Sequence, residues 1–374
     1  MIRLALVLGI SLALSSAAVG ADPVKTLPIG AAAPDFKLPG VDGKDYTLKS
    51  FADAKLLLVI FTCNHCPTAQ AYEKRITDLH ADYKGKGVAL VAISPNDPKA
   101  VRLDELGYTE LGDSLDDMKI RARDQKWTFP YLYDGDKQDA ARAFGCVATP
   151  QVFLFDADRK LRYQGRIDDS DVKTPTSHDT RNALDALLAG KPVPVETTRT
   201  FGCSTKWADK QPDAVKSLEK WDMEPVKLDA LDEAGLAKLL KNEGKKLLLI
   251  NVWATWCGPC VAELPEFVTM NRMYRRRPFE TITISIDEPE KKADALKVLQ
   301  EKKVAATNYL STIPKKDRLA ELLDKEWQGP LPYTLLISPE GKVIYRKQGS
   351  IDPLEVKRAV VEHLGRTYAA NKGK

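Results

Sequence analysis

The chain has 374 residues, of which 44% are apolar and 29% charged, so it can bury real cores and fits two domains more easily than one. The formal net charge is +4, from 56 basic and 52 acidic residues. That near balance gives no reason to expect nucleic acid or an anionic membrane as a partner.

The first 21 residues have the pattern of a secretory signal peptide. Arg3 precedes an almost wholly apolar run at residues 4–14, and small residues follow as far as Ala21. This run is short for a transmembrane helix, which needs about 20 apolar residues. We therefore expect cleavage near Ala21 and a soluble exported protein, periplasmic or secreted.

The first half of the remaining chain predicts a strand, a Cys-x-x-Cys pair and a helix. Residues 56–61 form a short apolar run typical of a buried strand, and Cys63 and Cys66 follow it. Residues 68–83 have a helical pattern. The later elements are a buried strand at 88–93, Thr149-Pro150 before a strand at 151–155, a strand ending at Gly165, and a helix at 181–188.

The same order recurs in the second half. Residues 247–253 predict a buried strand, and Cys257 and Cys260 follow in the sequence W-C-G-P-C. The later elements are a strand at 281–286, Leu331-Pro332 before a strand at 333–337, a strand ending at Gly349, and a helix at 353–363. One α/β unit is therefore predicted twice in the chain.

The spacing of both cysteine pairs indicates disulfide chemistry. A strand that turns into a helix places the first cysteine at the helix N-terminus, where free N–H groups and the helix dipole favour a thiolate. We expect Cys63 and Cys257 to attack the substrate disulfide, and Cys66 and Cys260 to resolve the mixed disulfide. The alternative is half of a zinc site, which needs two more ligands. The chain has only four histidines, and one zinc shared between two domains would have an odd geometry.

Two family resemblances follow from these motifs. W-C-G-P-C, A-E-L-P and L-P-Y-T-L-L-I-S-P-E-G resemble the TlpA/ResA type of exported thioredoxin, over about residues 224–374. I-G-A-A-A-P-D-F-K-L-P-G, F-T-C-N-H-C-P-T and G-R-I-D-D resemble the redoxin branch related to the alkyl hydroperoxide reductase/thiol-specific antioxidant family, over about residues 27–207. The resemblance implies an α/β protein with two thioredoxin-like folds in tandem, each a central mixed sheet flanked by helices. The expected division is a first domain at 22–195, a connector at 196–223 and a second domain at 224–374.

The resemblance also implies a substrate-binding loop at each site. In thioredoxin-like folds the X-Pro loop faces the cysteine pair and offers backbone groups to an extended substrate peptide. The residues implied to bind substrate are Thr149, Pro150, Leu331, Pro332 and Trp256, with both prolines in cis. The alternative for the prolines is an ordinary start of a strand.

Glu263 lies three residues after Cys260, as in the C-x-x-C-x-x-E pattern of the family. The resemblance implies that this carboxyl helps to move the proton of the resolving cysteine, and burial near a thiol would raise its pKa. The alternative is a solvated helix glutamate. The same offset in the first copy holds Ala69, which puts a shared proton relay in doubt.

His65 precedes Cys66 as the histidine does in the strongly oxidising C-P-H-C enzymes. A histidine there can stabilise the Cys63 thiolate and make this couple more oxidising than Cys257–Cys260. The alternative is an exposed loop residue with little effect.

Cys146 and Cys203 belong to neither pair. An even number of cysteines in an oxidising compartment favours a disulfide between them, which would tie the connector to the first domain. Two buried free thiols are the alternative.

These patterns favour a thiol–disulfide oxidoreductase that acts on exported proteins and passes electrons from the second site to the first. Its partners would be protein thiols and disulfides and a redox protein, with a membrane donor as an option, and no cofactor or metal is expected. The second candidate is a thiol peroxidase in which Cys66 attacks peroxide, Cys63 resolves it and the second domain is the reductant. The usual P-x-x-x-T-x-x-C signature is not met. The third candidate is a non-catalytic binding module, against which two intact cysteine pairs argue.

Overall fold

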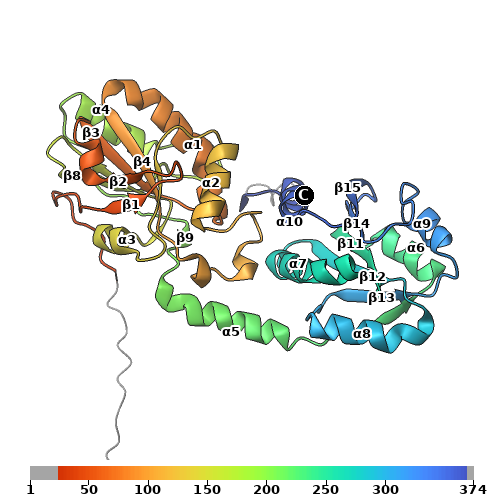
Figure 1. Ribbon diagram of the computed structural model, residues 1–374. Coiled ribbons are helices and arrows are strands. Elements are labelled where there is room, and N and C mark those ends of the chain that lie inside the picture. The colour runs from red at the N-terminus through yellow and green to blue at the C-terminus, as the bar shows by residue number, and fades with distance from the viewer. Residues whose placement is uncertain (1–23, 369–374) are drawn as a thin grey trace, which may run out of the picture.

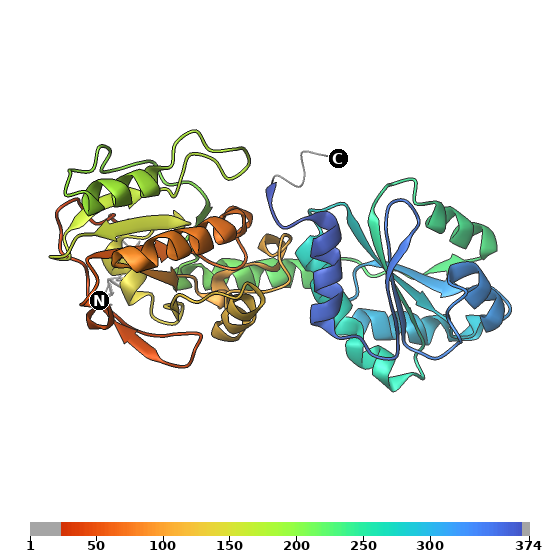
Figure 2. The same ribbon diagram turned by 90° about the horizontal axis from the view of Figure 1, so that it is seen from above.

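The computed structural model describes residues 24–368, and the predicted signal peptide, residues 1–21, lies outside them. Two α/β units lie side by side, and helix α5 (Gln211–Asp222) runs between them (Figures 1 and 2). Within residues 24–368, no helix combines the length and the apolar character that crossing a bilayer requires.

The first unit is built on a five-stranded mixed sheet in the order β5-β4-β3-β7-β8. The central strand β3 (Leu56–Phe61) runs parallel to β4 (Val88–Ser94) and antiparallel to β7 (Gln151–Phe155). The strands β5 (Tyr131–Tyr133) and β8 (Leu161–Gly165) form the two edges. Every residue of β3 is buried because the sheet is covered on both faces.

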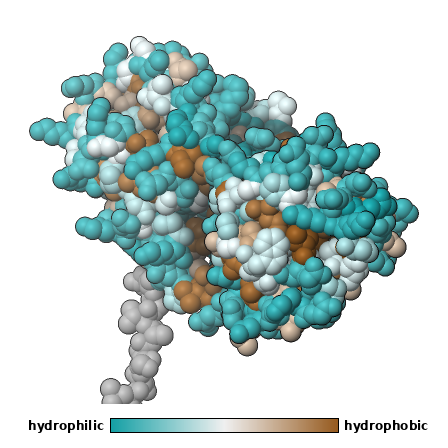
Figure 3. All heavy atoms as spheres, turned by 45° about the vertical axis from the view of Figure 1, so that its right-hand side comes forward, coloured by the Kyte–Doolittle hydropathy of each residue, from teal (hydrophilic) through white to brown (hydrophobic). Residues whose placement is uncertain are grey.

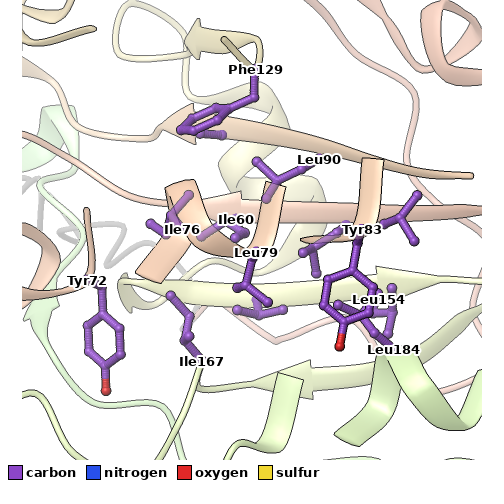
Figure 4. Close-up of a cluster of buried hydrophobic side chains, with 14 of the residues drawn as sticks. Ile60, Tyr72, Ile76, Leu79, Tyr83, Leu90, Phe129, Leu154, Ile167 and Leu184 are labelled. Atoms are coloured by element: carbon purple, nitrogen blue, oxygen red, sulfur yellow. The ribbon is translucent and has the colours of Figure 1, made fainter. Parts of the chain in front are cut away.

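Alternate residues of β3 serve two different cores. Leu58 and Ile60 pack into the core on one face, and Val59 and Phe61 into the core on the other. The first core is closed by helix α1 (Pro67–Tyr83), whose apolar side chains at helical spacing point onto the strands (Figure 4). The labelled side chains from α1 are Tyr72, Ile76, Leu79 and Tyr83, and they meet Ile60, Leu90 and Leu154 of the sheet.

The second unit is built on a six-stranded sheet in the order β10-β13-β12-β11-β14-β15. The four strands β10, β13, β12 and β11 run parallel to one another. The hairpin of β14 and β15 extends the sheet beyond β11, and β14 runs antiparallel to β11. The strands are β10 (Asp229–Leu231), β11 (Leu247–Trp253), β12 (Phe279–Ser285), β13 (Thr307–Ser311), β14 (Tyr333–Ile337) and β15 (Val343–Gln348). The prediction of an α/β protein with two thioredoxin-like folds in tandem is confirmed.

The remaining helices cover the sheets, and short elements complete the loops. In the first unit these are α2 (Leu115–Asp124), α3 (Asp139–Phe144), α4 (Asp179–Leu188), the hairpin of β1 (Lys37–Pro39) and β2 (Asp45–Thr47), and β6 (Ala148–Thr149), which pairs with β9 (Cys203–Ser204). In the second unit they are α6 (Glu233–Lys241), α7 (Gly258–Tyr274), α8 (Lys292–Glu301), α9 (Lys316–Leu323) and α10 (Pro353–Leu364). Short 3-10 helices are η1 (Leu48–Phe51), η2 (Lys84–Lys86), η3 (Pro98–Ala100), η4 (Leu103–Glu105), η5 (Ala208–Lys210) and η6 (Pro289–Lys291).

The segment between the two units is ordered along most of its length. Gln164 of β8 exchanges backbone hydrogen bonds with the chain at Glu196 and Thr198 before β9 pairs with β6. Helix α5 is tied at both ends, because Gln211 donates to Asp97 of the first unit at 2.5 Å and Asp222 accepts from Arg272 of the second at 2.6 Å.

The two units meet through the C-terminal end of α7 and the end of α10, which lies nearest to the first unit in Figure 2. Tyr274 donates to the Thr109 carbonyl at 3.2 Å, and the Arg277 guanidinium donates to the Gly107 carbonyl at 2.7 Å. Arg366 forms an ion pair with Glu110. The residues joined here are mostly buried, so these contacts fix how one unit sits on the other. Elsewhere hydrophilic side chains cover much of the face in Figure 3, with apolar residues gathered in a few areas.

Candidate redox sites

The first cysteine pair lies in the turn between β3 and α1. Cys66 is the N-cap of α1, and its sulfur accepts from the Ala69 N–H at 3.5 Å. The helix starts here because Pro67 suits the first helical position and holds the preceding residue in an extended conformation. Cys63 therefore lies three residues before the cap. The expectation that Cys63 occupies the helix N-terminus is wrong.

The pKa shifts of the two thiols also distinguish Cys66 from Cys63. Burial opposes ionisation of Cys66, but hydrogen bonds from the Cys203 and Cys63 thiols and the charge of His65 bring its pKa well below the ordinary value. For Cys63, burial comes first and the nearby Asp113 and Cys66 add to it, so its pKa is raised well above the ordinary value. The lowered pKa favours Cys66 over Cys63 as the cysteine that ionises, the reverse of the order of attack expected from the sequence.

His65 is buried rather than exposed. Its Nδ1 lies 2.5 Å from an Asp113 carboxylate oxygen, and Asp113 also accepts from the backbone N–H groups of Asn64 and His65 and from the Asn96 amide. Burial lowers the pKa of His65, but the Asp113 charge and hydrogen bond outweigh it, so the net shift is upward. The charge of His65 lowers the pKa of the Cys66 thiol. Sequence reasoning did not identify Asp113, which lies 48 residues from His65.

The Thr149-Pro150 loop lies against this pair, with a cis peptide bond. The Thr149 hydroxyl is 3.1 Å from the Cys63 sulfur, and the Thr149 carbonyl accepts from Cys66 at 3.5 Å. The loop thus touches both sulfurs.

Cys146 and Cys203 do not form the expected disulfide, because both thiols are free. The antiparallel register of β6 and β9 sets Cys203 opposite Thr149, three residues along from Cys146, a separation of roughly 10 Å. Cys146 is buried against the Ala148 carbonyl and the Thr205 hydroxyl, and burial raises its pKa to about 12. Cys203 packs instead against Cys63, Cys66 and Ala69.

In the second unit the cysteines have the expected positions. Cys257 is the N-cap of α7, its sulfur accepts from the Cys260 N–H at 3.3 Å, and the two sulfurs form a disulfide of 2.06 Å. The Leu331-Pro332 bond is cis, as at the first site. Trp256 is 67% exposed and lines a cavity of about 410 Å³ together with Asp287 and Ile313.

Glu263 is buried on α7, one turn beyond Cys260, and is not a solvated helix residue. Its carboxylate accepts from the Asn251 amide at 2.9 Å and from the Ile351 N–H at 3.1 Å. Burial raises the pKa of Glu263 although both hydrogen bonds oppose the shift. In the first unit, Glu73 is paired with Arg121 at 3.6 Å, so it serves the packing of α1 and not the sulfurs.

Cys63, His65 and Asp113 could also be considered as metal ligands, because their candidate atoms all lie within 4.8 Å of one another. The His65 Nδ1 and the Asp113 oxygen already satisfy each other in a hydrogen bond. A metal held by these two atoms would have to replace that bond, so the arrangement favours a charged histidine beside a thiolate over a zinc site.

The fold and the two turns place this chain among the thioredoxin-fold proteins that carry a Cys-x-x-Cys pair. The pattern of the AhpC/TSA family matches residues 29–164 and 222–346, and the chain belongs to that family.

Individual relatives match the chain over part of its length. The thiol-disulfide oxidoreductase ResA of Oceanobacillus iheyensis is 33% identical over 110 residues, 29% of this chain and 52% of that protein. The chain spans about half to two thirds of the length of the curated relatives it matches. A hypothetical protein of Sinorhizobium meliloti has a solved structure with 35% identity, over 49% of this chain and 97% of that one, with a TM-score of 0.44. An uncharacterized conserved protein of Geobacillus kaustophilus has 38% identity over 48% and 92%, with a TM-score of 0.43.

Proposed function

We propose that this protein is an exported thiol–disulfide oxidoreductase that exchanges disulfides with protein substrates at Cys257 and Cys260. The observation that carries the proposal is the disulfide at the N-terminus of α7, beside a cis X-Pro loop and an exposed tryptophan. The likeness of the chain to ResA proteins named thiol-disulfide oxidoreductases supports it. The signal-like pattern of residues 1–21 supports export, which N-terminal sequencing of the mature protein tests.

In the reducing direction the proposed exchange has two steps. The Cys257 thiolate attacks a substrate disulfide, forms a mixed disulfide and releases one substrate thiol. Cys260 loses its proton and attacks the Cys257 sulfur, which releases the second substrate thiol and forms the Cys257–Cys260 disulfide. Two electrons pass to the substrate. Glu263 has a raised pKa and lies one turn from Cys260, which suits it to accept and return that proton.

The two sites differ in access to a protein substrate. At the second site the residue before the pair, Trp256, is exposed and lines a cavity. Both cysteine pairs are buried, but at the first site the backbone edge at Ala148 and Thr149 is already paired with β9. An incoming peptide cannot use that edge while β9 occupies it. Protein substrates are therefore assigned to the second unit.

A direct relay between the sites is opposed by this arrangement. Cys257 lies at the N-terminal end of α7, and the C-terminal end of α7 contacts the first unit. Seventeen helical residues span roughly 25 Å. Electron transfer from the second site to the first would then need an external carrier or contact between different molecules.

The test is reduction of insulin by the full-length protein with dithiothreitol as electron source. Cys257→Ser should abolish the activity, and Cys260→Ser should accumulate mixed disulfides, since attack survives and resolution fails. Cys63→Ser/Cys66→Ser is the matched control and should retain the rate. Full activity of Cys257→Ser would refute the assignment.

A peroxidase is the second candidate, and one observation favours it. Cys66, not Cys63, is the N-cap cysteine with the lowered pKa, as a peroxide-attacking cysteine requires. If the candidate is right, the reduced protein consumes hydrogen peroxide and Cys66→Ser stops consumption while insulin reduction continues. No consumption above the rate of a free thiol would leave disulfide exchange as the function of both sites.

A further inference from the structure

Cys203 belongs to the first redox site although it lies far from it in sequence. Its side chain packs against the buried cluster of Cys63, Cys66 and Ala69. Cys63 and Cys203 are therefore both sulfur neighbours of Cys66, and both contribute to the lowered pKa of Cys66. The disulfide exchange proposed above uses only the Cys-x-x-Cys residues and leaves Cys203 without a role.

The backbone holds Cys203 in this position. Strand β9 pairs antiparallel with β6, and Cys203 is the partner of Thr149, whose carbonyl accepts from Cys66. Gly202 makes this approach possible, since it has φ of +141° and a Cβ there would lie 2.0 Å from the Thr149 carbonyl oxygen. Only glycine lets the chain pass so close to the cis-proline loop.

Cys203 is also the cysteine of this site that reaches solvent. Cys63 and Cys66 are buried, whereas Cys203 is partly exposed. It lines a cavity of about 280 Å³ at the junction of the two units, together with His65 and Tyr108. The charged lining residues are the basic Arg102, Lys206, Arg276 and Arg277 and the acidic Asp104 and Glu105. Four basic against two acidic side chains favour a small anionic thiol over a cationic one.

We propose that Cys203 is a third redox cysteine, which forms a disulfide with Cys66 and transfers electrons from a small anionic thiol in the cavity to the buried pair. This rests on the proposed function and extends disulfide exchange from Cys257–Cys260 to the Cys63–Cys66 pair. The Cys203 sulfur attacks Cys66 in the Cys63–Cys66 disulfide, and Cys63 leaves and takes up the proton that Cys203 has lost. An external thiolate then attacks Cys203 and releases the Cys66 thiolate. A second external thiolate resolves the mixed disulfide at Cys203. Two thiols become one disulfide, and Cys63 and Cys66 are reduced.

The first experiment traps the disulfide in full-length Cys63→Ser. The reduced protein is oxidised with one equivalent of diamide, blocked with N-ethylmaleimide and digested with trypsin without a reductant. Cleavage after Lys55, Lys74, Arg199 and Lys206 places Cys66 in peptide 56–74 and Cys203 in peptide 200–206. We expect these two peptides linked by a disulfide, and equally in the control Cys63→Ser/Cys146→Ser. Alkylated Cys203 in the oxidised protein, or Cys66 found only in disulfides between molecules, would overturn the proposal.

The second experiment measures reduction of the Cys63–Cys66 disulfide by excess glutathione. Cys203→Ser should slow it at least tenfold, whereas Cys146→Ser should leave the rate unchanged, because Cys146 does not touch the pair. An unchanged rate in Cys203→Ser would overturn the electron-transfer role. Insulin reduction by the same proteins separates this proposal from the proposed function. If only the role of Cys203 is wrong, the Cys203→Ser variant still reduces insulin. If the proposed function is wrong, the unsubstituted protein does not reduce insulin either.

Discussion

At the scale of single residues, the position of one proline decides which cysteine of each pair is the helix N-cap. Pro67 follows Cys66 directly, so α1 begins after the second cysteine of the pair. In the second unit Pro259 lies between the cysteines, and α7 begins directly after Cys257. The same Cys-x-x-Cys spacing thus presents opposite cysteines to the two helix N-termini.

Cys66 should ionise before any other thiol of the first site. We expect a thiolate step well below the pH of an ordinary cysteine when the reduced protein is titrated by far-ultraviolet absorbance, because the Ala69 N–H and His65 favour the charged sulfur. The measurement uses Cys257→Ser/Cys260→Ser to leave out the second site. Adding Cys66→Ser should remove the step and adding Cys63→Ser should keep it; the reverse result would restore Cys63 as the nucleophile.

His65→Asn should make the first couple more reducing. The amide keeps a hydrogen bond to Asp113 but removes the positive charge, so the pKa of Cys66 rises and the reduced form loses stability. Each unit of that rise is worth about 1.4 kcal/mol, or about 30 mV for two electrons. Redox titration of the full chain against glutathione measures the shift. An unchanged potential would show that His65 acts only in packing.

At the scale of elements, β9 gives the first site its closed character. Strand β9 comes from the segment between the units and pairs with β6, next to the Thr149-Pro150 loop. Among residues 24–368, no strand pairs in this way with the corresponding Leu331-Pro332 loop of the second unit. The two sites share the same motifs, but within the part of the chain that the structure describes only the second leaves the backbone edge of its X-Pro loop free for a substrate peptide.

Gly202→Ala should displace β9 from β6. A Cβ 2.0 Å from the Thr149 oxygen at φ +141° cannot be accommodated, and we expect a loss of about 1–3 kcal/mol in the free energy of unfolding together with faster alkylation of Cys66. Gly190→Ala is the matched control, because Gly190 also has a positive φ, +69°, but nothing lies within 4 Å of its Cβ position. Equal effects of the two substitutions would mean that backbone strain alone, and not contact with Thr149, is responsible.

At the scale of the whole molecule, α5 and the junction around Arg277 hold the two redox sites apart. Arg277 is buried and donates to carbonyls of Gly107 in the first unit and of Leu364 and Gly365 in the second. The cavity beside Cys203 lies at this junction, whereas the disulfide of the second unit lies at the far end of α7.

Electron transfer between the two sites should therefore depend on protein concentration. Full-length protein with the second site reduced and the first oxidised is followed by alkylation and mass measurement. Because roughly 25 Å of helix separates the sites, transfer must occur between molecules, and its apparent rate constant should rise in proportion to concentration. A rate that does not change with dilution would show that the units rearrange and transfer electrons internally.

The sequence by itself determined the duplication, the α/β class, both cysteine pairs and both X-Pro loops. These features rest on local patterns, since apolar runs define buried strands and short motifs define the turns between them. The sequence also marks the helix start at Pro67, but this signal was overlooked because the two Cys-x-x-Cys pairs were treated as equivalent from their spacing. Only the tertiary structure decided the place of Asp113 and Cys203. Their positions depend on pairing between segments 48 and 54 residues apart, such as Asp113 with His65 and Cys203 with Thr149, and no local periodicity records such contacts. The junction of the two units was equally beyond local patterns. It combines polar side chains such as Arg277 with Leu103 and Leu106, which pack against the core of the second unit, and none of these residues is marked by a motif.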